Sequence, residues 1–218
     1  MASRKFKIIS SILIGLVLLL GVCWYLFRNS EKIYSAGEIP LPQQIIAYSQ
    51  KNPDWAEDNL GESGYTMADS GCLVTCLCCA MSMQNIMQIT PKELNRLLSE
   101  QHGYDTEGNL QWEILEKLTE TEVIFDNADI SALLYDGIYP VVRVRMYGIG
   151  SFHYVLIVGS QDDTYVCIDP LQEENVLVSL GNYGNRIYAV RWLNHSYEVK
   201  YGGIMDESVL RNITQSGQ

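Results

Sequence analysis

A cysteine, a histidine and an aspartate occur in settings that suit nucleophilic catalysis by a thiolate. Cys72 follows Gly71 and opens a strongly apolar run, which indicates the first turn of a buried helix. His153 stands at the head of an apolar stretch with the character of a strand, and Asp169 closes the next such stretch. A helix N-terminus lowers the pKa of a thiol, a histidine serves as its base, and a carboxylate orients the histidine. The set predicts a triad of these three side chains.

Gln50 is a fourth candidate, because a side-chain amide can join the Cys72 backbone N–H in stabilising an oxyanion. Taken one at a time, these residues also have ordinary structural explanations. Cys72 suits a buried structural cysteine, His153 a hydrogen-bonded core histidine, and Asp169 a turn carboxylate before Pro170. The catalytic interpretation is favoured by their combination.

Residues 152–169 are predicted to form a hairpin that brings His153 and Asp169 together. A three-residue loop, Gln161 to Asp163, would place Asp169 opposite Val155, on the same face as His153 and diagonal to it. A two-residue loop would place the two side chains on opposite faces, because side chains alternate along a strand. The triad hypothesis therefore depends on the register of this hairpin.

Five cysteines lie beyond the N-terminal apolar run: Cys72, Cys76, Cys78, Cys79 and Cys167. Four of them fall within eight residues of one predicted helix, where disulfide geometry would be poor. Burial as small apolar side chains explains those other than Cys72. A zinc site would need a second pair of ligands at suitable spacing, and Cys167 stands alone. No metal and no organic cofactor are expected.

The elements that must position these residues change character along the chain. Apolar residues at helical spacing come first and predict four helices. One spans residues 72–87, and one begins at a Thr90 N-cap followed by Pro91 and Glu93. A third follows an Asn109 N-cap, and a fourth spans residues 130–135.

After Pro140 the apolar residues follow the period of strands, over residues 141–144, 152–159, 164–169, 176–180 and 186–193. Consecutive short strands with tight turns indicate an antiparallel sheet. Helices followed by strands predict an α+β fold, with an N-terminal helical half packed on a C-terminal antiparallel β-sheet.

The run Ile8 to Phe27 contains 20 residues without a charge, enough for a helix to cross a bilayer. Three basic residues precede the run and two follow it, which favours a cytoplasmic N-terminus. A cleaved signal peptide and a lipid anchor at Cys23 are the alternatives. The predicted organisation is a cytoplasmic segment over 1–7, a transmembrane anchor over 8–27, a stalk over 28–43, a globular domain over 44–195 and a tail over 196–218.

The formal net charge of −11 hides an asymmetry along the chain. Five of the 15 basic residues and one of the 26 acidic residues lie in the first 32 positions, so the remainder carries ten basic and 25 acidic residues. Nucleic-acid binding is disfavoured, because it needs basic surface that neutralises phosphates. The acidity could favour cationic substrates, although solubility explains it equally simply.

Several short motifs occur in an order typical of one family. They are Gln50 with Trp55, Gly71-Cys72, Thr90-Pro91-x-Glu93-Leu94, Pro140-Val141-Val142, His153-Tyr154-Val155 and Ile168-Asp169-Pro170. In this order, residues 44–193 resemble the C39-like cysteine peptidases of the papain-like superfamily.

The resemblance implies a papain-like fold without a cofactor. It implies Cys72 as nucleophile, His153 as general base and then acid, Asp169 as the orienting group and Gln50 as the oxyanion donor. The chain departs from the family at Leu73-Val74-Thr75, where Gly-Pro or Gly-Ala with Thr often follows the cysteine. It also lacks the transporter that better-known relatives carry, so their cytoplasmic cutting of leader peptides is not transferred.

We therefore expect a membrane-anchored thiol hydrolase outside the cytoplasm that cleaves peptide or protein substrates. A catalytically inactive peptide-binding module with the same fold is one alternative. A related acyltransferase or cell-wall amidase is another. The walls of the substrate pocket are expected from the loop Gln50–Ser70 and from the segment Tyr147–Gly150, whose glycines allow close approach to a ligand.

Overall fold

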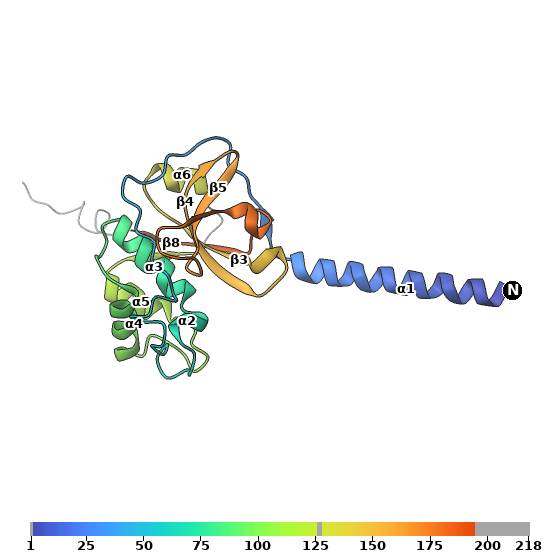
Figure 1. Cartoon of the computed structure of the whole chain (residues 1–218), viewed down its shortest axis with the longest axis horizontal. Coiled ribbons are helices and arrows are strands. Elements are labelled where there is room, and N and C mark those ends of the chain that lie inside the picture. Colours follow the sequence, from blue (N-terminus) through green and yellow to red (C-terminus); the bar gives the residue numbers. More distant parts are fainter. Residues whose placement is uncertain (1, 126–127, 195–218) are drawn as a thin grey trace, which may run out of the picture.

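The computed structural model describes residues 2–125 and 128–194 as a long helix followed by a body of helices and strands (Figure 1). The end of the predicted domain at residue 195 and the predicted tail over 196–218 lie outside the described residues.

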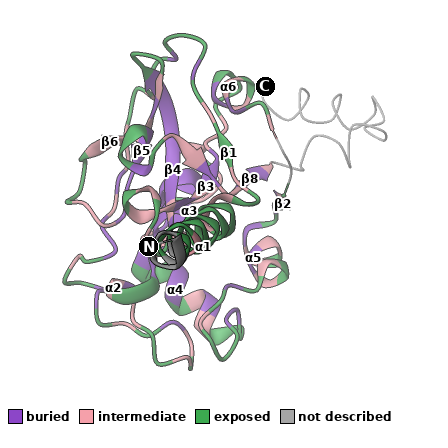
Figure 2. Ribbon diagram, turned by 90° about the vertical axis from the view of Figure 1, so that its right-hand side faces the viewer, coloured by how far each residue is buried: buried purple, intermediate pink, exposed green. Residues whose placement is uncertain are grey.

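Helix α1, Ala2–Phe27, extends away from the body (Figure 1). Its segment Ile8–Phe27 is long and apolar enough to cross a membrane, and none of its most apolar stretch is buried. A helix rises about 1.5 Å per residue, so 20 residues match a hydrocarbon core of about 30 Å. Large apolar side chains therefore remain exposed along α1, as the green colour in Figure 2 shows.

The remaining helices are short, and most of them precede the strands. Their bounds are α2 Met67–Ser70, α3 Cys72–Met83, α4 Pro91–Glu100, α5 Trp112–Thr119 and α6 Ile130–Tyr135. Two 3₁₀ turns, η1 Met146–Gly148 and η2 Leu180–Tyr183, lie among the strands. Helices α2 to α5 gather on one side of the sheet (Figure 1).

The predicted helix boundaries are confirmed in part. At the start of α4 the Thr90 backbone N–H donates to the Glu93 carboxylate at 2.9 Å, and the Glu93 N–H donates to the Thr90 hydroxyl at 3.3 Å, completing the capping box. Helix α3 ends at Met83 rather than near residue 87. The Asn109 cap is wrong, because α5 begins after Gln111 and the Asn109 side chain instead donates to Asp105.

Six strands form one antiparallel sheet in the order β2-β8-β3-β4-β5-β6. Their bounds are β2 Glu122–Ile124, β3 Val141–Arg145, β4 Phe152–Gln161, β5 Thr164–Ile168, β6 Leu177–Ser179 and β8 Ala189–Asn194. A separate pair consists of β1 Glu31–Lys32 and β7 Arg186–Ile187. The α+β fold with an antiparallel sheet is confirmed, and β1 and β2 are strands that the alternation of residues did not predict.

Alternating side chains along β3 and β4 supply two apolar cores, one on each face of the sheet. Val141 and Leu156 pack with the helical half, whereas Val142 and Val155 pack on the opposite face with α6 and η2. Both strands are therefore buried on both faces, as their purple colour in Figure 2 shows.

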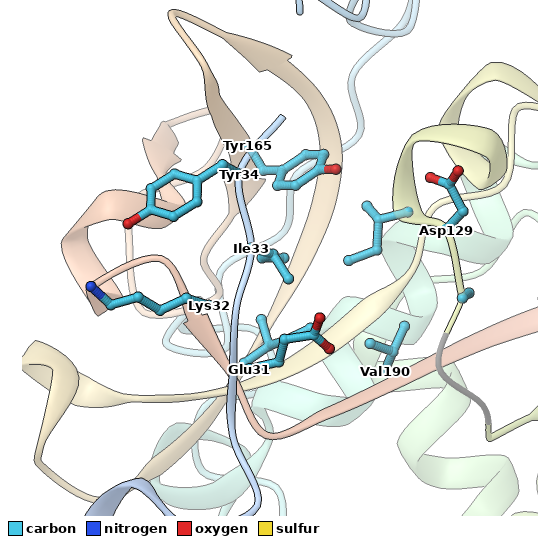
Figure 3. A pocket seen from close by; sticks show the side chains of 10 residues that line it. Glu31, Lys32, Ile33, Tyr34, Asp129, Tyr165 and Val190 are labelled. Carbon is cyan, nitrogen blue, oxygen red and sulfur yellow. The ribbon is translucent and has the colours of Figure 1, made fainter. Parts of the chain in front are cut away.

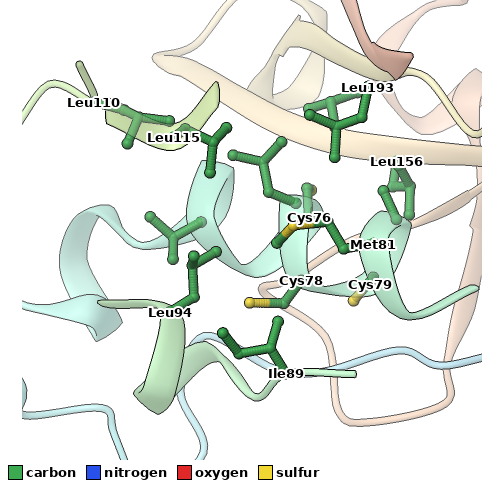
Figure 4. Packing of buried hydrophobic residues seen from close by; sticks show 14 of the residues in the cluster. Cys76, Cys78, Cys79, Met81, Ile89, Leu94, Leu110, Leu115, Leu156 and Leu193 are labelled. Atoms are coloured by element: carbon green, nitrogen blue, oxygen red, sulfur yellow. The ribbon is translucent and has the colours of Figure 1, made fainter. Parts of the chain in front are cut away.

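Three cysteines of α3 point into the apolar core. Figure 4 shows Cys76, Cys78 and Cys79 among Leu94 and Leu156, and all three cysteines are fully buried. The cysteines of the described residues are unpaired. They therefore act as small apolar side chains, as predicted.

The segment over 28–43, which follows α1, lies along the sheet for part of its length. Strand β1 pairs with β7, and Ile39 forms an antiparallel bridge with Ser160. The end of α1 is also tied to the body, because the Tyr188 hydroxyl donates to the Leu26 carbonyl at 2.9 Å. These contacts hold the body close to the end of the apolar helix.

Candidate active site

The hairpin of β4 and β5 has a tighter turn than the sequence predicts. Gln161 pairs with Thr164, so the loop contains only Asp162 and Asp163. Both have positive φ, 49° and 59°, which is the backbone that two-residue hairpin turns require. The three-residue loop is therefore wrong, and without further change Asp169 would face away from His153.

A β-bulge corrects the register further along the same hairpin. Gly159 pairs with Val166 and Ile157 pairs with Cys167, so Val158 is an extra residue on β4. Beyond the bulge Leu156 pairs with Ile168.

Continuing this register by one residue sets Val155 opposite Asp169. The predicted diagonal relation of Asp169 to His153 is thus reached through a bulge rather than through the loop. Gly159 permits the bulge beside a neighbouring segment, because a Cβ there would lie 2.9 Å from the Ile39 carbonyl oxygen.

His153 and Asp169 form a buried, hydrogen-bonded pair. His153 Nε2 donates to Asp169 Oδ1 at 2.6 Å, and the two residues are 4% and 2% exposed. Asp169 also accepts from the Leu171 backbone N–H at 2.9 Å, from Gln172 Nε2 at 3.1 Å and from the Tyr183 hydroxyl at 2.7 Å. Each carboxylate oxygen therefore has two donors, which hold the side chain in one orientation.

Burial raises the pKa of the Asp169 carboxyl, but the hydrogen bonds from His153 and Tyr183 outweigh it and lower the pKa to about 2. Burial lowers the pKa of His153, but hydrogen bonds with Asp169 and Cys72 outweigh it and raise the pKa to about 9. At neutral pH both members of the pair are therefore charged.

Cys72 is the first residue of α3 and is half-buried. The nearby thiol contributes, after Asp169, to the raised pKa of His153. Because Nε2 is taken by Asp169, Nδ1 is the ring atom that remains for the thiol. The predicted pairing of His153 with Asp169 is thus present, and the place of Cys72 in a triad stays a prediction.

Gly71 precedes Cys72 because a larger residue would have no room for its side chain, and not because the backbone angle is unusual. Its φ is an ordinary −77°, but a Cβ would lie 2.5 Å from the Met67 carbonyl oxygen. The last turn of α2 thus presses directly on the start of α3. A glycine at this point lets the two helices meet and sets the position of the Cys72 backbone.

Gln50 connects the end of the hairpin with the helix that precedes Cys72. Its backbone N–H donates to the Pro170 carbonyl at 2.8 Å, and its Nε2 donates to the Ala68 carbonyl at 2.7 Å. The residue is 2% exposed, and its Oε1 has no partner among the described residues. Nε2 carries a second N–H beyond the one that Ala68 accepts.

A pocket of about 310 Å³ opens beside Cys72. Its walls include the apolar side chains of Leu60, Leu110 and Trp112, and the polar groups of Arg191. The loop Gln50–Ser70 contributes to the walls, as predicted, but Tyr147–Gly150 does not. Residues between Tyr104 and Trp112 line the pocket instead.

The other cysteines of the body differ from Cys72 in their surroundings. Burial raises the pKa of Cys76 and Cys78 well above the ordinary value and that of Cys79 to about 12. A buried thiol of this kind is a poor nucleophile, because the thiolate is the reactive form. Cys72 is the partly exposed thiol in the body, and within the described residues no group of three His, Cys, Asp or Glu side chains could hold a metal ion.

A second pocket, of about 430 Å³, shares no lining residue with the pocket beside Cys72. Figure 3 shows it between residues 31–34, Asp129 of the α6 N-cap, and the sheet residues Tyr165 and Val190. Its lining includes neither a cysteine nor a histidine, so it offers no thiol for this chemistry.

Tyr183 and Gln172 are the contacts of the site that the sequence analysis missed. Tyr183 lies in η2, 14 residues beyond the aspartate that it contacts, and is one of 14 tyrosines in the chain. No local pattern marks it. Only the packing of η2 against β5 brings its hydroxyl to the carboxylate.

Comparison with protein-family models finds no match for this chain, and comparison with curated proteins finds none either. Among solved structures, the chain is similar to a crystal structure from Bacillus anthracis whose name assigns it provisionally to the C39-like peptidases. The alignment covers 72% of this chain and 98% of that chain, with a TM-score of 0.47 and 12% sequence identity.

Proposed function

We propose that this protein is a membrane-anchored thiol hydrolase of the papain-like, C39-like type that cleaves peptide bonds outside the cytoplasm. One observation carries the proposal: the buried His153 ring is bonded to Asp169 through Nε2 at 2.6 Å, which leaves Nδ1 available to the Cys72 thiol. A histidine held between a thiol and a carboxylate is the arrangement that thiol hydrolysis requires.

The reaction requires the proton of the Cys72 thiol to lie on His153 when the sulfur attacks. The raised pKa of His153, about 9, favours the imidazolium at neutral pH, and an imidazolium stabilises an adjacent thiolate. The first turn of α3 adds the positive end of a helix dipole at the sulfur. Asp169 stays ionised and fixes the ring so that Nδ1 faces the sulfur.

In the first half-reaction, the Cys72 sulfur adds to the carbonyl carbon of the peptide bond and an oxyanion forms. The Cys72 backbone N–H, which has no carbonyl within α3 to bond, is one donor for this oxygen. The second N–H of Gln50 Nε2 is the other. His153 then passes its proton to the departing nitrogen, the C–N bond breaks, and a thioester with an amine product results.

In the second half-reaction, neutral His153 takes a proton from a water molecule, which adds to the thioester carbon. The C–S bond breaks and the electron pair returns to sulfur. A carboxylic acid leaves, and the imidazolium–thiolate pair is restored. Each proton removed from water or returned to product passes through His153, so its position between Cys72 and Asp169 serves both halves.

The proposed location follows from α1. Its length and composition suit a membrane span, and three basic residues before the span against two after it favour a cytoplasmic N-terminus. The body, which follows the span, would then face outward. Contacts between the end of α1 and Tyr188 would keep it near the bilayer surface.

A peptide carrying a thiol-reactive electrophile tests the proposal on the full chain in detergent micelles. Labelling is expected at Cys72 and absent from the Cys72→Ala variant. Cys23→Ala is the matched control, because Cys23 is the exposed thiol of α1 and its loss should leave labelling intact. Analysis of products separates the chemistries: a free carboxylate means hydrolysis, and a new amide bond means acyl transfer. Equal labelling of the Cys72→Ala variant and the unchanged chain would remove Cys72 from the mechanism.

A further inference from the structure

Arg191 lies in the wall of the pocket beside Cys72, against three aromatic rings. Its guanidinium carbon lies 5.2 Å from the ring centroid of Trp112, 5.3 Å from that of Phe125 and 5.7 Å from that of Tyr154. Nη1 donates weakly to the Tyr154 hydroxyl at 3.3 Å, and the buried Nε has no hydrogen-bond partner among the described residues. In the part of the chain that the structure describes, no carboxylate forms an ion pair with it.

The same pattern occurs twice more, at Arg143 and Arg145 of β3. Their guanidinium carbons lie 4.3 Å and 4.2 Å from the ring centroid of Phe152, and the Nε of each is buried and unpartnered. Arg145 Nη1 donates to the Gly150 carbonyl at 2.8 Å. Within the described residues, neither arginine forms an ion pair with a carboxylate. The two positively charged guanidinium groups therefore pack against one aromatic ring, and no described carboxylate neutralises them.

The three arginines lie on one face of the sheet and form a row. Arg191 pairs with Val141, and Arg143 pairs with Ala189, so the two arginines are diagonal neighbours on β8 and β3. Arg145 follows two positions along β3, on the same face. Diagonal neighbours and alternate residues of a strand are both about 7 Å apart. The row thus extends from the pocket beside Cys72 along β3, on the face of the sheet that carries Val141.

This row is unexpected in an acidic body. Beyond residue 32 the chain has 25 acidic and ten basic residues, so carboxylates to pair with arginine are plentiful. Three neighbouring guanidinium groups repel one another, and arginine does not release its proton to relieve the repulsion. Glu107 also lines the pocket but is exposed and forms no ion pair with Arg191. An anion from outside the chain would neutralise the row.

We infer that the substrate is an acidic peptide whose carboxylate enters the pocket beside Cys72 and binds Arg191, with further carboxylates along the Arg143–Arg145 pair. The inference rests on the proposed function for the position of the cleaved bond. Guanidinium groups bind carboxylates in a two-point geometry. Side chains on one face of an extended peptide repeat about every 7 Å, which matches the spacing of the row. The pocket therefore selects against the cationic substrates that the net acidity of the chain suggests.

Peptide binding to the full-length Cys72→Ala variant in detergent micelles tests the inference without catalysis. The probes are fluorescent extended peptides that carry Glu, Gln or Lys at alternate positions, and the measurement is fluorescence anisotropy. We expect the Glu peptide to bind about tenfold or more tightly than the Gln peptide, and the Lys peptide to bind more weakly still. Salt should weaken binding of the Glu peptide and leave the Gln peptide almost unchanged.

Adding Arg191→Met should reduce the Glu peptide to the affinity of the Gln peptide. Arg191→Lys should restore part of the preference, because the charge remains and the two-point geometry is lost. Arg96→Met is the matched control, since Arg96 lies on the exposed surface of α4 and pairs with Glu100. The comparison of peptides on the Cys72→Ala chain needs no arginine variant, so an arginine variant that fails to fold does not remove the test.

Equal binding of the Glu and Gln peptides would overturn the inference. If Arg191→Met or Arg143→Met then altered only the binding of a short-chain anionic phospholipid, the arginines would serve lipid headgroups instead. A preference for Glu that survives Arg191→Met would overturn the assignment to the pocket. Selective binding of the Glu peptide by a chain that cleaves no peptide would uphold the inference and refute the proposed hydrolase.

Discussion

Replacing Asp169 with asparagine should lower the pKa of His153 by removing the charge that holds its proton. His153 has a pKa of about 9 because the contacts with Asp169 and Cys72 outweigh burial, which is the largest single influence on the ring and acts in the opposite direction. Without the carboxylate, burial should prevail and bring the pKa to about 6.5 or lower.

The size of the effect follows from the two values. A fall from about 9 to about 6.5 corresponds to about 3 kcal/mol lost by the imidazolium. At pH 8 the protonated fraction of His153 should drop from about 90% to about 3%, whereas at pH 6 most of the rings should remain protonated. The defect of the Asp169→Asn variant should therefore be severe above pH 7 and largely relieved below pH 6.

An NMR titration of labelled histidine in the full chain measures this pKa directly and needs no substrate. Asp163→Asn is the matched control, because Asp163 lies in the turn of the same hairpin and does not contact His153. A His153 pKa near 6.5 in the unchanged chain, or one that stays near 9 in Asp169→Asn, would refute the reasoning. If Asp169 had a merely structural role, the Asp169→Asn variant should unfold and should not regain activity at low pH.

Three further outcomes follow from the same contacts. Gln50→Ala should lower the rate of peptide hydrolysis about 10²–10³-fold while Cys72 still reacts with a small electrophile, measured by steady-state kinetics and mass spectrometry. Gly71→Ala should destabilise the body by about 1–3 kcal/mol in urea unfolding, because its Cβ would lie 2.5 Å from the Met67 carbonyl oxygen. Unfolding free energy should be greatest between about pH 4 and 6.5. Asp169, with its lowered pKa, loses its contribution to stability as the pH falls from about 4 to about 2. His153, with its raised pKa, loses its contribution to stability as the pH rises from about 6.5 to about 9. Urea titrations across this range measure both losses of stability.

The parts of the fold that depend on neighbouring residues could be predicted from the sequence. Thr90 and Glu93 satisfy each other's backbone within one turn, so the start of α4 was predictable. The apolar run after Gly71 and the alternation over β3 and β4 likewise identified the buried helix and strands. Asn109 misled for a related reason: its side chain suits a cap, but Asp105 supplies a competing partner nearby.

The pairing of Asp169 opposite Val155 was predicted from the sequence, but the way in which the hairpin reaches this register was not. The expected loop had three residues, whereas the loop has two and the missing offset is supplied by the bulge at Val158. A bulge forms where packing against a neighbouring segment favours it, here beside Ile39, which lies more than 100 residues earlier in the chain. Such a segment cannot be placed from the residues of the hairpin.

The amino-acid sequence by itself determined the types and order of the groups that could do chemistry. It also determined their local settings: Cys72 at a helix start, His153 at the head of a strand and Asp169 at the end of the next. Only the tertiary structure decided that His153 Nε2 faces Asp169, that Tyr183 supports the carboxylate, and that Arg191 lies in the pocket against Trp112. The physical reason is the distance along the chain over which each effect acts. Helix and strand propensities and helix caps depend on a few neighbouring residues, whereas these contacts join residues that only packing and strand register bring together.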